Sequence, residues 1–205
     1  AIKREINHRL ARGMAISACY IDIAGFKPYC ALHGAEGQRR VLEFFADGSV
    51  REVAGGFSGI YDIVAAEDGT IFVSDYETGN ITRIDPDGTQ RILAEKVLYR
   101  DPLDLALDST GNLYLNSVVT GFVRIDRSSG AFTRIESAHS PCTIHPADFD
   151  ITEDGRALFV DPTLSTVTWA DLNSGENGML VSNQGANTMA LDVGADDALY
   201  IGLDA

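Results

Sequence analysis

The stretch IYDIVAAEDGTIFVSD, residues 60–75, decides the fold because its pattern returns along the chain. PLDLALDSTGNLYLNS, residues 102–117, matches it without gaps 42 residues later, and PADFDITEDGRALFVD, residues 146–161, follows after a further 44. Residues 188–201 repeat the pattern again, and residues 20–32 form a more divergent copy. A fixed period between about 20 and 50 residues is typical of repeat architectures. The sequence therefore predicts five copies of one structural unit.

Each copy has an apolar strand, a turn and a second strand rich in Tyr, Phe, Val and Leu. The turns contain Asp68-Gly69, Thr110-Gly111 and Asp154-Gly155. Glycine tolerates the backbone angles of tight hairpins, and aspartate readily bonds to the backbone of a turn. Each copy is thus predicted to be a β-hairpin with both faces buried.

A second hairpin, in which apolar and charged residues alternate, follows each copy. It is clearest in residues 41–53, 81–93 and 122–135. Alternation suits an outer strand with one face on a neighbour and one in water. Two inner and two outer strands per repeat predict an all-β fold, a β-propeller of four-stranded blades. A β-sandwich is the alternative, but a sandwich need not repeat.

We expect a single domain over residues 1–205, with blades at about 20–56, 57–98, 99–142, 143–184 and 185–205. The five repeats would form a closed five-bladed ring or a fragment of a six-bladed one. Residues 1–19 could complete the last blade, with outer strands over residues 2–15. An amphipathic helix competes with this prediction, because Ile2, Ile6, Leu10 and Met14 are spaced by four.

The net charge and the apolar content limit the classes of partner that the chain can bind. A net charge of −14 repels nucleic acid and anionic membrane surfaces, so we expect a protein or small-molecule ligand. No stretch of about 18 apolar residues could span a bilayer. Lys3, Arg4 and Glu5 carry charges where a secretion signal would need its apolar run, so we expect that any signal has already been removed. Three cysteines, an odd number, favour a reducing, cytoplasmic compartment over a disulfide framework.

The inner strands share a further pattern that resembles known propellers. Pro102 or Pro146 opens a strand, a Gly turn follows, and the second strand ends near Asp75 or Asp161 before an R-I-D stretch. This pattern resembles the NHL-repeat group and is similar to the streptogramin lyases and the gluconolactonase-like lactonases. The resemblance implies a propeller scaffold, usually of six blades.

The lactonases place an acidic and amide metal site at the channel mouth, where Asn-Gly or Asp-Gly pairs open the inner strands. This chain has Ala147-Asp148 and Met189-Ala190 at those places. Their catalytic residues are therefore not carried over, and the catalytic residues of this chain are unknown.

Aspartate recurs where NHL repeats commonly have glycine. These residues are Asp22, Asp62, Asp104 and Asp148. If the blades are equivalent, the carboxylates form a ring at the channel mouth that binds a divalent cation or a positively charged ligand. Alternatively, each aspartate caps backbone N–H groups at the start of its strand.

A second set of chemically active residues precedes the fourth repeat. His139, Cys142 and His145 are three residues apart, and Asp148 follows after three more. These residue types can hold zinc, and three protein ligands with an open position would suit activation of water. The spacing is no established zinc signature, and a lone cysteine beside a strand is often simply buried.

No serine elbow or phosphate-binding loop occurs in the sequence. We therefore expect a binding or interaction module that uses one propeller face or the channel mouth. The alternative is a metal-dependent hydrolase or lyase acting at that mouth with Ca, Mg or Zn.

Overall fold

The computed structural model describes residues 16–20, 29–33, 39–44, 49–95, 104–117, 121–135, 148–161, 164–182, 187–193 and 199–204. Every element in these ranges is a β-strand, as the all-β prediction requires. The chain divides into two compact units, Ala1–Arg100 and Asp101–Ala205, and each is described by itself.

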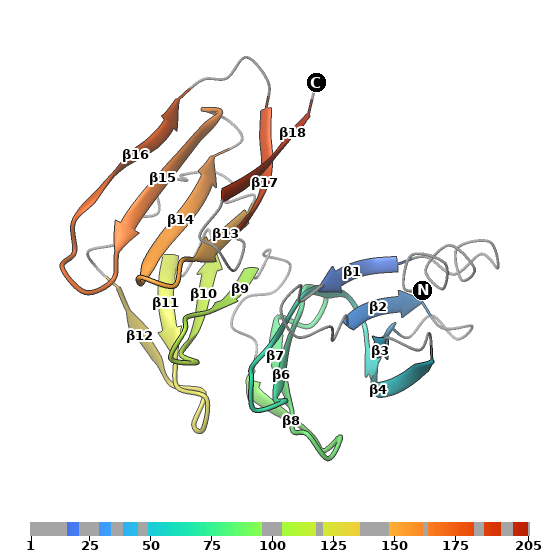
Figure 1. The fold of residues 1–205 in the computed structure, drawn as a ribbon. Helices are drawn as coiled ribbons and strands as arrows, with labels where there is room; N and C mark the ends of the chain where they lie inside the picture. Colours follow the sequence, from blue (N-terminus) through green and yellow to red (C-terminus); the bar gives the residue numbers. More distant parts are fainter. Residues whose placement is uncertain are drawn as a thin grey trace. The chain divides into compact units, whose positions relative to one another are not determined.

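The first unit contains two four-stranded antiparallel sheets (Figure 1). Strand order in each sheet follows the sequence, so both are simple meanders. The first sheet consists of β1 (Ile16–Tyr20), β2 (Tyr29–His33), β3 (Arg39–Phe44) and β4 (Val50–Phe57). The second consists of β5 (Ile60–Ala65), β6 (Ile71–Asp75), β7 (Asn80–Ile84) and β8 (Gln90–Ala94).

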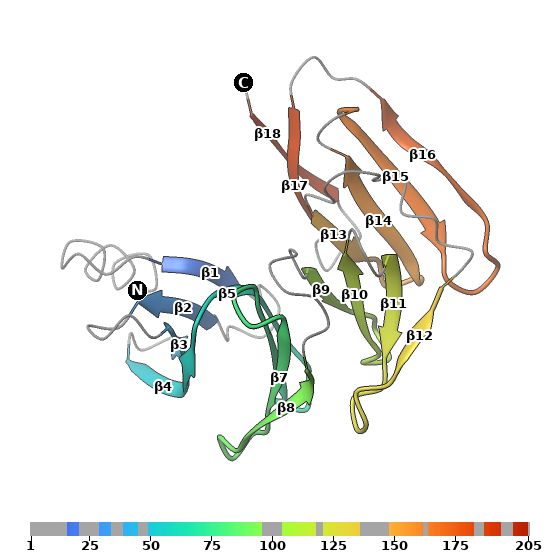
Figure 2. The same ribbon diagram turned by 180° about the vertical axis from the view of Figure 1, so that it is seen from behind.

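The second unit contains two more meanders and a two-stranded sheet (Figure 2). The third sheet has β9 (Asp104–Leu107), β10 (Leu113–Ser117), β11 (Gly121–Ile125) and β12 (Phe132–Arg134). The fourth has β13 (Asp148–Ile151), β14 (Arg156–Asp161), β15 (Thr166–Asp171) and β16 (Asn177–Ser182). The fifth pairs β17 (Asn187–Val193) with β18 (Leu199–Asp204).

The predicted inner and outer hairpins are confirmed in these sheets. In the divergent first copy, β1 covers Ile16–Tyr20 and pairs with β2, and residues 21–28 lie outside the described residues. Of residues 1–19, predicted to complete the last blade, residues 1–15 also lie outside the described residues.

The predicted Asp-Gly turns connect the inner strands. Between β5 and β6 the Gly69 N–H donates to the carbonyl of Ala66, and the Ala66 N–H donates to the carbonyl of Thr70. Gly69 has a φ of 82°, a left-handed conformation that favours glycine. Asp68 accepts the Thr70 N–H at 2.9 Å, so each residue of the Asp-Gly pair has its own role.

The core lies between successive sheets within each unit. The first strands of consecutive sheets contact each other, β1 with β5, β9 with β13, and β13 with β17. Between the third and fourth sheets, Phe122 makes edge contacts with Phe149 and Phe159, at centroid distances of 5.5 and 5.1 Å. Such aromatic pairs contribute about 0.5–1.5 kcal/mol beyond the area they bury. Successive sheets therefore pack face against face, and the ends of their strands lie along the sheet edges.

Candidate functional site at the mouth edges

Three of the predicted site residues fall on the same edge of the second, third and fourth sheets. In each antiparallel meander the first strand begins where the second ends, and we call this edge the mouth edge. Asp104 and Asp148 are the first residues of β9 and β13, and Asp62 lies near the start of β5. Asp22 is outside the described residues.

Two of the predicted aspartates reach across to the next sheet. Oδ2 of Asp104, a residue only 7% exposed, accepts the backbone N–H of Phe149 on β13 at 2.8 Å. Oδ2 of Asp148 accepts the N–H of Leu191 on β17 at 2.9 Å. Each carboxylate therefore ties its own sheet to the first strand of the following sheet.

Asp62 also accepts a backbone N–H on its own strand. Its Oδ1 accepts the N–H of Ile63 at 2.7 Å, and its own N–H donates to Oγ of Ser74 on β6 at 3.0 Å. All three aspartates thus accept backbone N–H groups, which is the bonding expected of the capping alternative. Ligand binding by the four aspartates stays a prediction.

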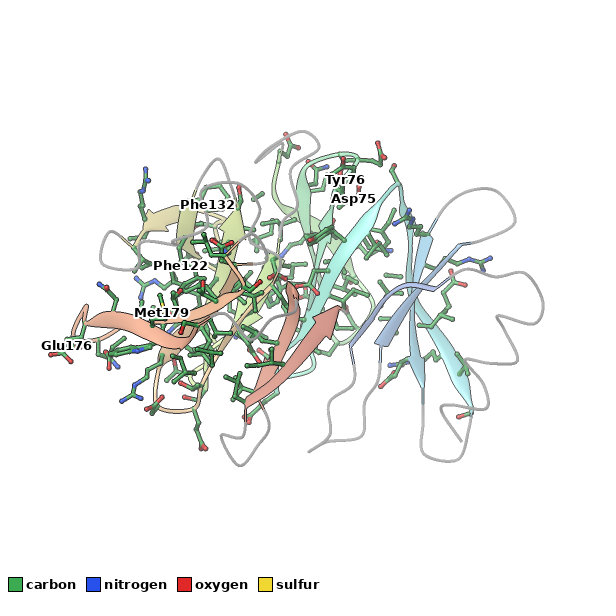
Figure 3. All side chains as sticks on the ribbon, turned by 90° about the horizontal axis from the view of Figure 1, so that it is seen from above. Asp75, Tyr76, Phe122, Phe132, Glu176 and Met179 are labelled. Atoms are coloured by element: carbon green, nitrogen blue, oxygen red, sulfur yellow. The ribbon has the colours of Figure 1, made fainter. Side chains whose placement is uncertain are left out.

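Sequence reasoning did not single out Asp75, the last residue of β6, for its bonding (Figure 3). This residue is 3% exposed, and its carboxylate accepts four backbone N–H groups. The donors are Ser58 at 2.8 Å, Gly59 and Glu77 at 3.0 Å, and Thr78 at 3.1 Å. Asp161, at the end of β14, similarly accepts the N–H of Leu164 at 3.0 Å. These carboxylates hold the loops of the mouth edges in place.

Asn116, on β10, is the mouth-edge residue whose bonding differs. It is 0% exposed, and in the described part of the chain neither its Nδ2 nor its Oδ1 has a hydrogen-bond partner. Its cross-strand neighbours are Asp104 on β9 and Phe122 on β11. Aligning the repeats could have found it, because Asn116 matches Ser74 and Val160. Of these three side chains, the Asn amide carries the most hydrogen-bonding atoms, an acceptor oxygen and an NH₂ donor group.

The predicted metal-binding set lies mostly outside the described residues. His139, Cys142 and His145 fall between β12 and β13, and only Asp148 is described. Across the ranges with described side chains, no three His, Cys, Asp or Glu residues could together hold a metal ion.

A polar network stands at the opposite edge of the third sheet, in the turn between β9 and β10. Asp108 accepts hydrogen bonds from the Tyr114 hydroxyl at 3.0 Å and from Nδ2 of Asn112 at 2.7 Å. Burial, the charge of Asp108 and this hydrogen bond raise the pKa of Tyr114 to about 12. For Asp108, burial raises the pKa, but hydrogen bonds led by those of Asn112 and Thr110 outweigh it and lower the pKa.

Comparison with solved structures identifies the arrangement. A virginiamycin B lyase from Staphylococcus aureus matches 91% of this chain and 62% of its own at 14% identity, with a TM-score of 0.70. A chain of the nidogen–laminin complex matches 92% and 72% at 16% identity, with a TM-score of 0.72. A gluconolactonase from Xanthomonas campestris matches 92% and 69% at 18% identity, with a TM-score of 0.70.

The chain is a β-propeller. The predicted relation to streptogramin lyases and lactonases is confirmed at the level of the fold. No family model and no curated protein matches the sequence. The propeller spans 62% and 63% of the two lyase chains from Staphylococcus aureus, and its number of blades stays a prediction.

The propeller fold gives the mouth edges a common location within each unit. In β-propellers the four-stranded blades are arranged around a central channel. In the second unit the hydrogen bond between Asp104 and the Phe149 N–H holds the mouth edge of the third sheet against the first strand of the fourth. In the part of the propeller that the structure describes, no helix is long and apolar enough to cross a membrane.

Proposed function

We propose that the chain is a binding module that holds a ligand or partner protein at the mouth edges of its blades. The observation that carries this proposal is the bonding of the mouth-edge carboxylates. Asp75, Asp104 and Asp148 all accept backbone N–H groups, so they already serve the scaffold. A rigid mouth edge suits recognition, because a preorganised binding surface loses less conformational entropy when a ligand binds.

The comparisons support binding in one further respect. One of the similar structures is a complex between two proteins, nidogen and laminin. The net charge of −14 favours neutral or cationic partners over anionic ones.

A metal-dependent hydrolase or lyase is the second candidate, because two similar propellers are a lyase and a gluconolactonase. In this alternative His139, Cys142, His145 and Asp148 hold a divalent ion, Ca, Mg or Zn. The ion would activate water at the channel mouth. Asp148 begins β13 and so lies at the mouth edge, where this chemistry would take place.

Metal analysis separates the two candidates. The purified protein is titrated with Ca²⁺, Mg²⁺ and Zn²⁺ by calorimetry, and its metal content is measured by mass spectrometry. Asp150→Asn is a matched control for Asp148→Asn, because Asp150 bonds the N–H of Val193 on the same strand, β17. A binding module gives no stoichiometric metal in any variant.

The enzyme candidate predicts a different pattern. A stoichiometric ion would be present in the wild type and in Asp150→Asn, and would be lost in both His145→Ala and Asp148→Asn. That result would overturn the binding-module proposal.

A further inference from the structure

The amide of Asn116 lies in a position that the scaffold does not require to be polar. Asn116 is the second-last residue of β10, and both hydrogen-bonding atoms of its buried side chain are without a partner in the described structure. A buried polar group that makes no hydrogen bond carries the full cost of its desolvation. Native proteins rarely retain such a group without a reason.

The other blades show what the scaffold itself needs at this position. In the second blade Ser74 is 0% exposed, and its Oγ accepts the Asp62 N–H. In the fourth blade Val160 is 0% exposed and brings no polar side-chain atom. Both solutions leave nothing unsatisfied, since one side chain is bonded and the other is apolar. The third blade alone of these three places an unbonded amide between two sheets.

We propose that Asn116 is a ligand-binding residue that takes an uncharged group carrying both a donor and an acceptor, a hydroxyl or a carboxamide. This inference rests on the proposed function and names the ligand class of its site. The group enters at the mouth edge between the third and fourth blades. There it bonds Oδ1 and Nδ2 of Asn116 together.

The neighbours of Asn116 explain the preference for an uncharged group. A metal cation would bond Oδ1 and leave the Nδ2 donor unsatisfied, whereas an anion would do the reverse. The Asp104 carboxylate on the adjacent strand also repels an anion. On the other side, Phe122 is 2% exposed and belongs to the aromatic core, so it offers an apolar wall.

Thermal unfolding gives the first test. Asn116→Val copies the fourth blade and removes two unsatisfied atoms, so the Tm rises by roughly 2–8 °C. Ser74→Val is the matched control at the equivalent position, and its Tm falls because the Asp62 N–H loses its acceptor. If Asn116→Val lowers the Tm as Ser74→Val does, the amide is a scaffold group and the inference is wrong.

Nuclear magnetic resonance gives the second test. The Asn116 side-chain NH₂ signals in a ¹⁵N-labelled sample are assigned by their loss in Asn116→Val. Acetamide and glycerol serve as uncharged probes, and sodium acetate and calcium chloride as charged ones. The uncharged probes shift the Asn116 signals saturably. Their binding weakens at least 10-fold in Asn116→Val and is unchanged in Ser74→Val.

The other outcomes are distinguishable. Uncharged probes that bind other mouth-edge residues equally well in Asn116→Val overturn this inference and leave the proposed function standing. A shift produced by calcium alone overturns both and favours the metal-dependent candidate. Protected NH₂ signals in contact with water, unmoved by every probe, show a buried water site and also overturn the inference.

Discussion

Asp104 is an almost fully buried acidic residue, and a hydrogen bond to the next sheet stabilises its carboxylate there. Its carboxylate accepts the Phe149 N–H across 45 residues of sequence. A buried carboxylate that accepts a backbone N–H stabilises the fold, because removing it leaves the donor unsatisfied in the interior. Asp148 repeats the arrangement one sheet later with Leu191.

Replacement of this acceptor should destabilise the third and fourth sheets together. Asp104→Ala is expected to lower the free energy of unfolding by about 1.5–3 kcal/mol, the range for hydrogen bonds to charged groups. Urea denaturation measures the loss, and hydrogen exchange at the Phe149 amide locates it. The exposed Glu67→Ala should change stability by less than about 0.5 kcal/mol. Unchanged protection of Phe149 would contradict the assignment.

Tyr114 should remain protonated well beyond the ordinary range. Its pKa in the folded protein, about 12, exceeds the usual 10.0. The stabilisation is therefore complete below pH 10 and is lost as the pH rises towards 12. Absorbance at 295 nm should show a phenolic transition near pH 12 that is missing in Tyr114→Phe. Completion of all tyrosine transitions by pH 11 in the folded wild type would disprove it.

At this scale the sequence predicts more about residue types than about their partners. The recurrence of aspartate at positions 62, 104 and 148 is visible in the repeats. The donor to Asp104 is not, because it depends on which sheet stacks against which. The repeat alignment places Asn116 beside Ser74 and Val160, but the sequence does not show that its amide is buried without a hydrogen-bond partner.

At the scale of elements, the turns between the third and fourth strands of the second, third and fourth sheets share a hydrogen-bonding pattern that stabilises a carboxylate. Asp87, Asp126 and Asp171 each accept backbone N–H groups two or three residues ahead. Such hydrogen bonds favour the charged carboxylate, so the pKa of each is lowered from 3.8. The effect is strongest at Asp126, where the hydroxyls of Ser128 and Ser129 also donate.

Acid titration should show the lowered pKa of the Asp126 carboxyl. A ¹³C titration of the Asp126 carboxyl is expected to have its midpoint below pH 3.8. The hydroxyl of Ser128 and the backbone N–H and hydroxyl of Ser129 donate hydrogen bonds that favour the charged carboxylate. The associated stability is present above pH 3.8 and is lost as the pH falls through the lowered pKa. Replacing both serines by alanine should raise the midpoint towards 3.8 and leave Asp171 unchanged. An unaltered Asp126 midpoint in that variant would refute the explanation.

The hairpins themselves were predictable because two independent signals agreed. Apolar residues in the inner strands and Asp-Gly turns gave the same boundaries for β5, β6, β13 and β14. In these copies the turn residues and the hydrophobic pattern therefore fix the position of the hairpin together.

At the scale of the whole molecule, each unit is held by contacts between successive sheets. The two-stranded sheet β17–β18 covers Leu158, Val160 and Val167 of the fourth sheet. It also donates the N–H groups that Asp148 and Asp150 accept. The last hairpin therefore protects an apolar surface as well as satisfying two carboxylates.

Removal of residues 187–205 should expose that surface. The truncated protein is expected to bind the dye ANS and to melt at a lower temperature than the full chain, because buried valine and leucine side chains meet water. The double variant Asp148→Ala/Asp150→Ala keeps the apolar cover, so its Tm should fall less and it should not bind ANS. Equal dye binding by the double variant and the truncated chain would show that the hydrogen bonds hold the hairpin in place.

The repeat predicted the fold class. Ring closure and the predicted metal-binding residues depend on residues 1–15 and 139–145, which lie outside the described ranges. No period in a sequence reports how its first and last copies meet. Closure depends on a contact between the first and last blades, and the pattern within each copy does not report such a contact.

The ties between sheets also have a direction along the chain. In each of the three bonds made by Asp104, Asp148 and Asp150, the acceptor precedes its donor by 43 to 45 residues. A polypeptide leaving the ribosome therefore presents every such carboxylate before the amide that will bind it. The first strands of the fourth and fifth sheets thus emerge after the carboxylates that bind them, so these sheets can assemble in the order of translation.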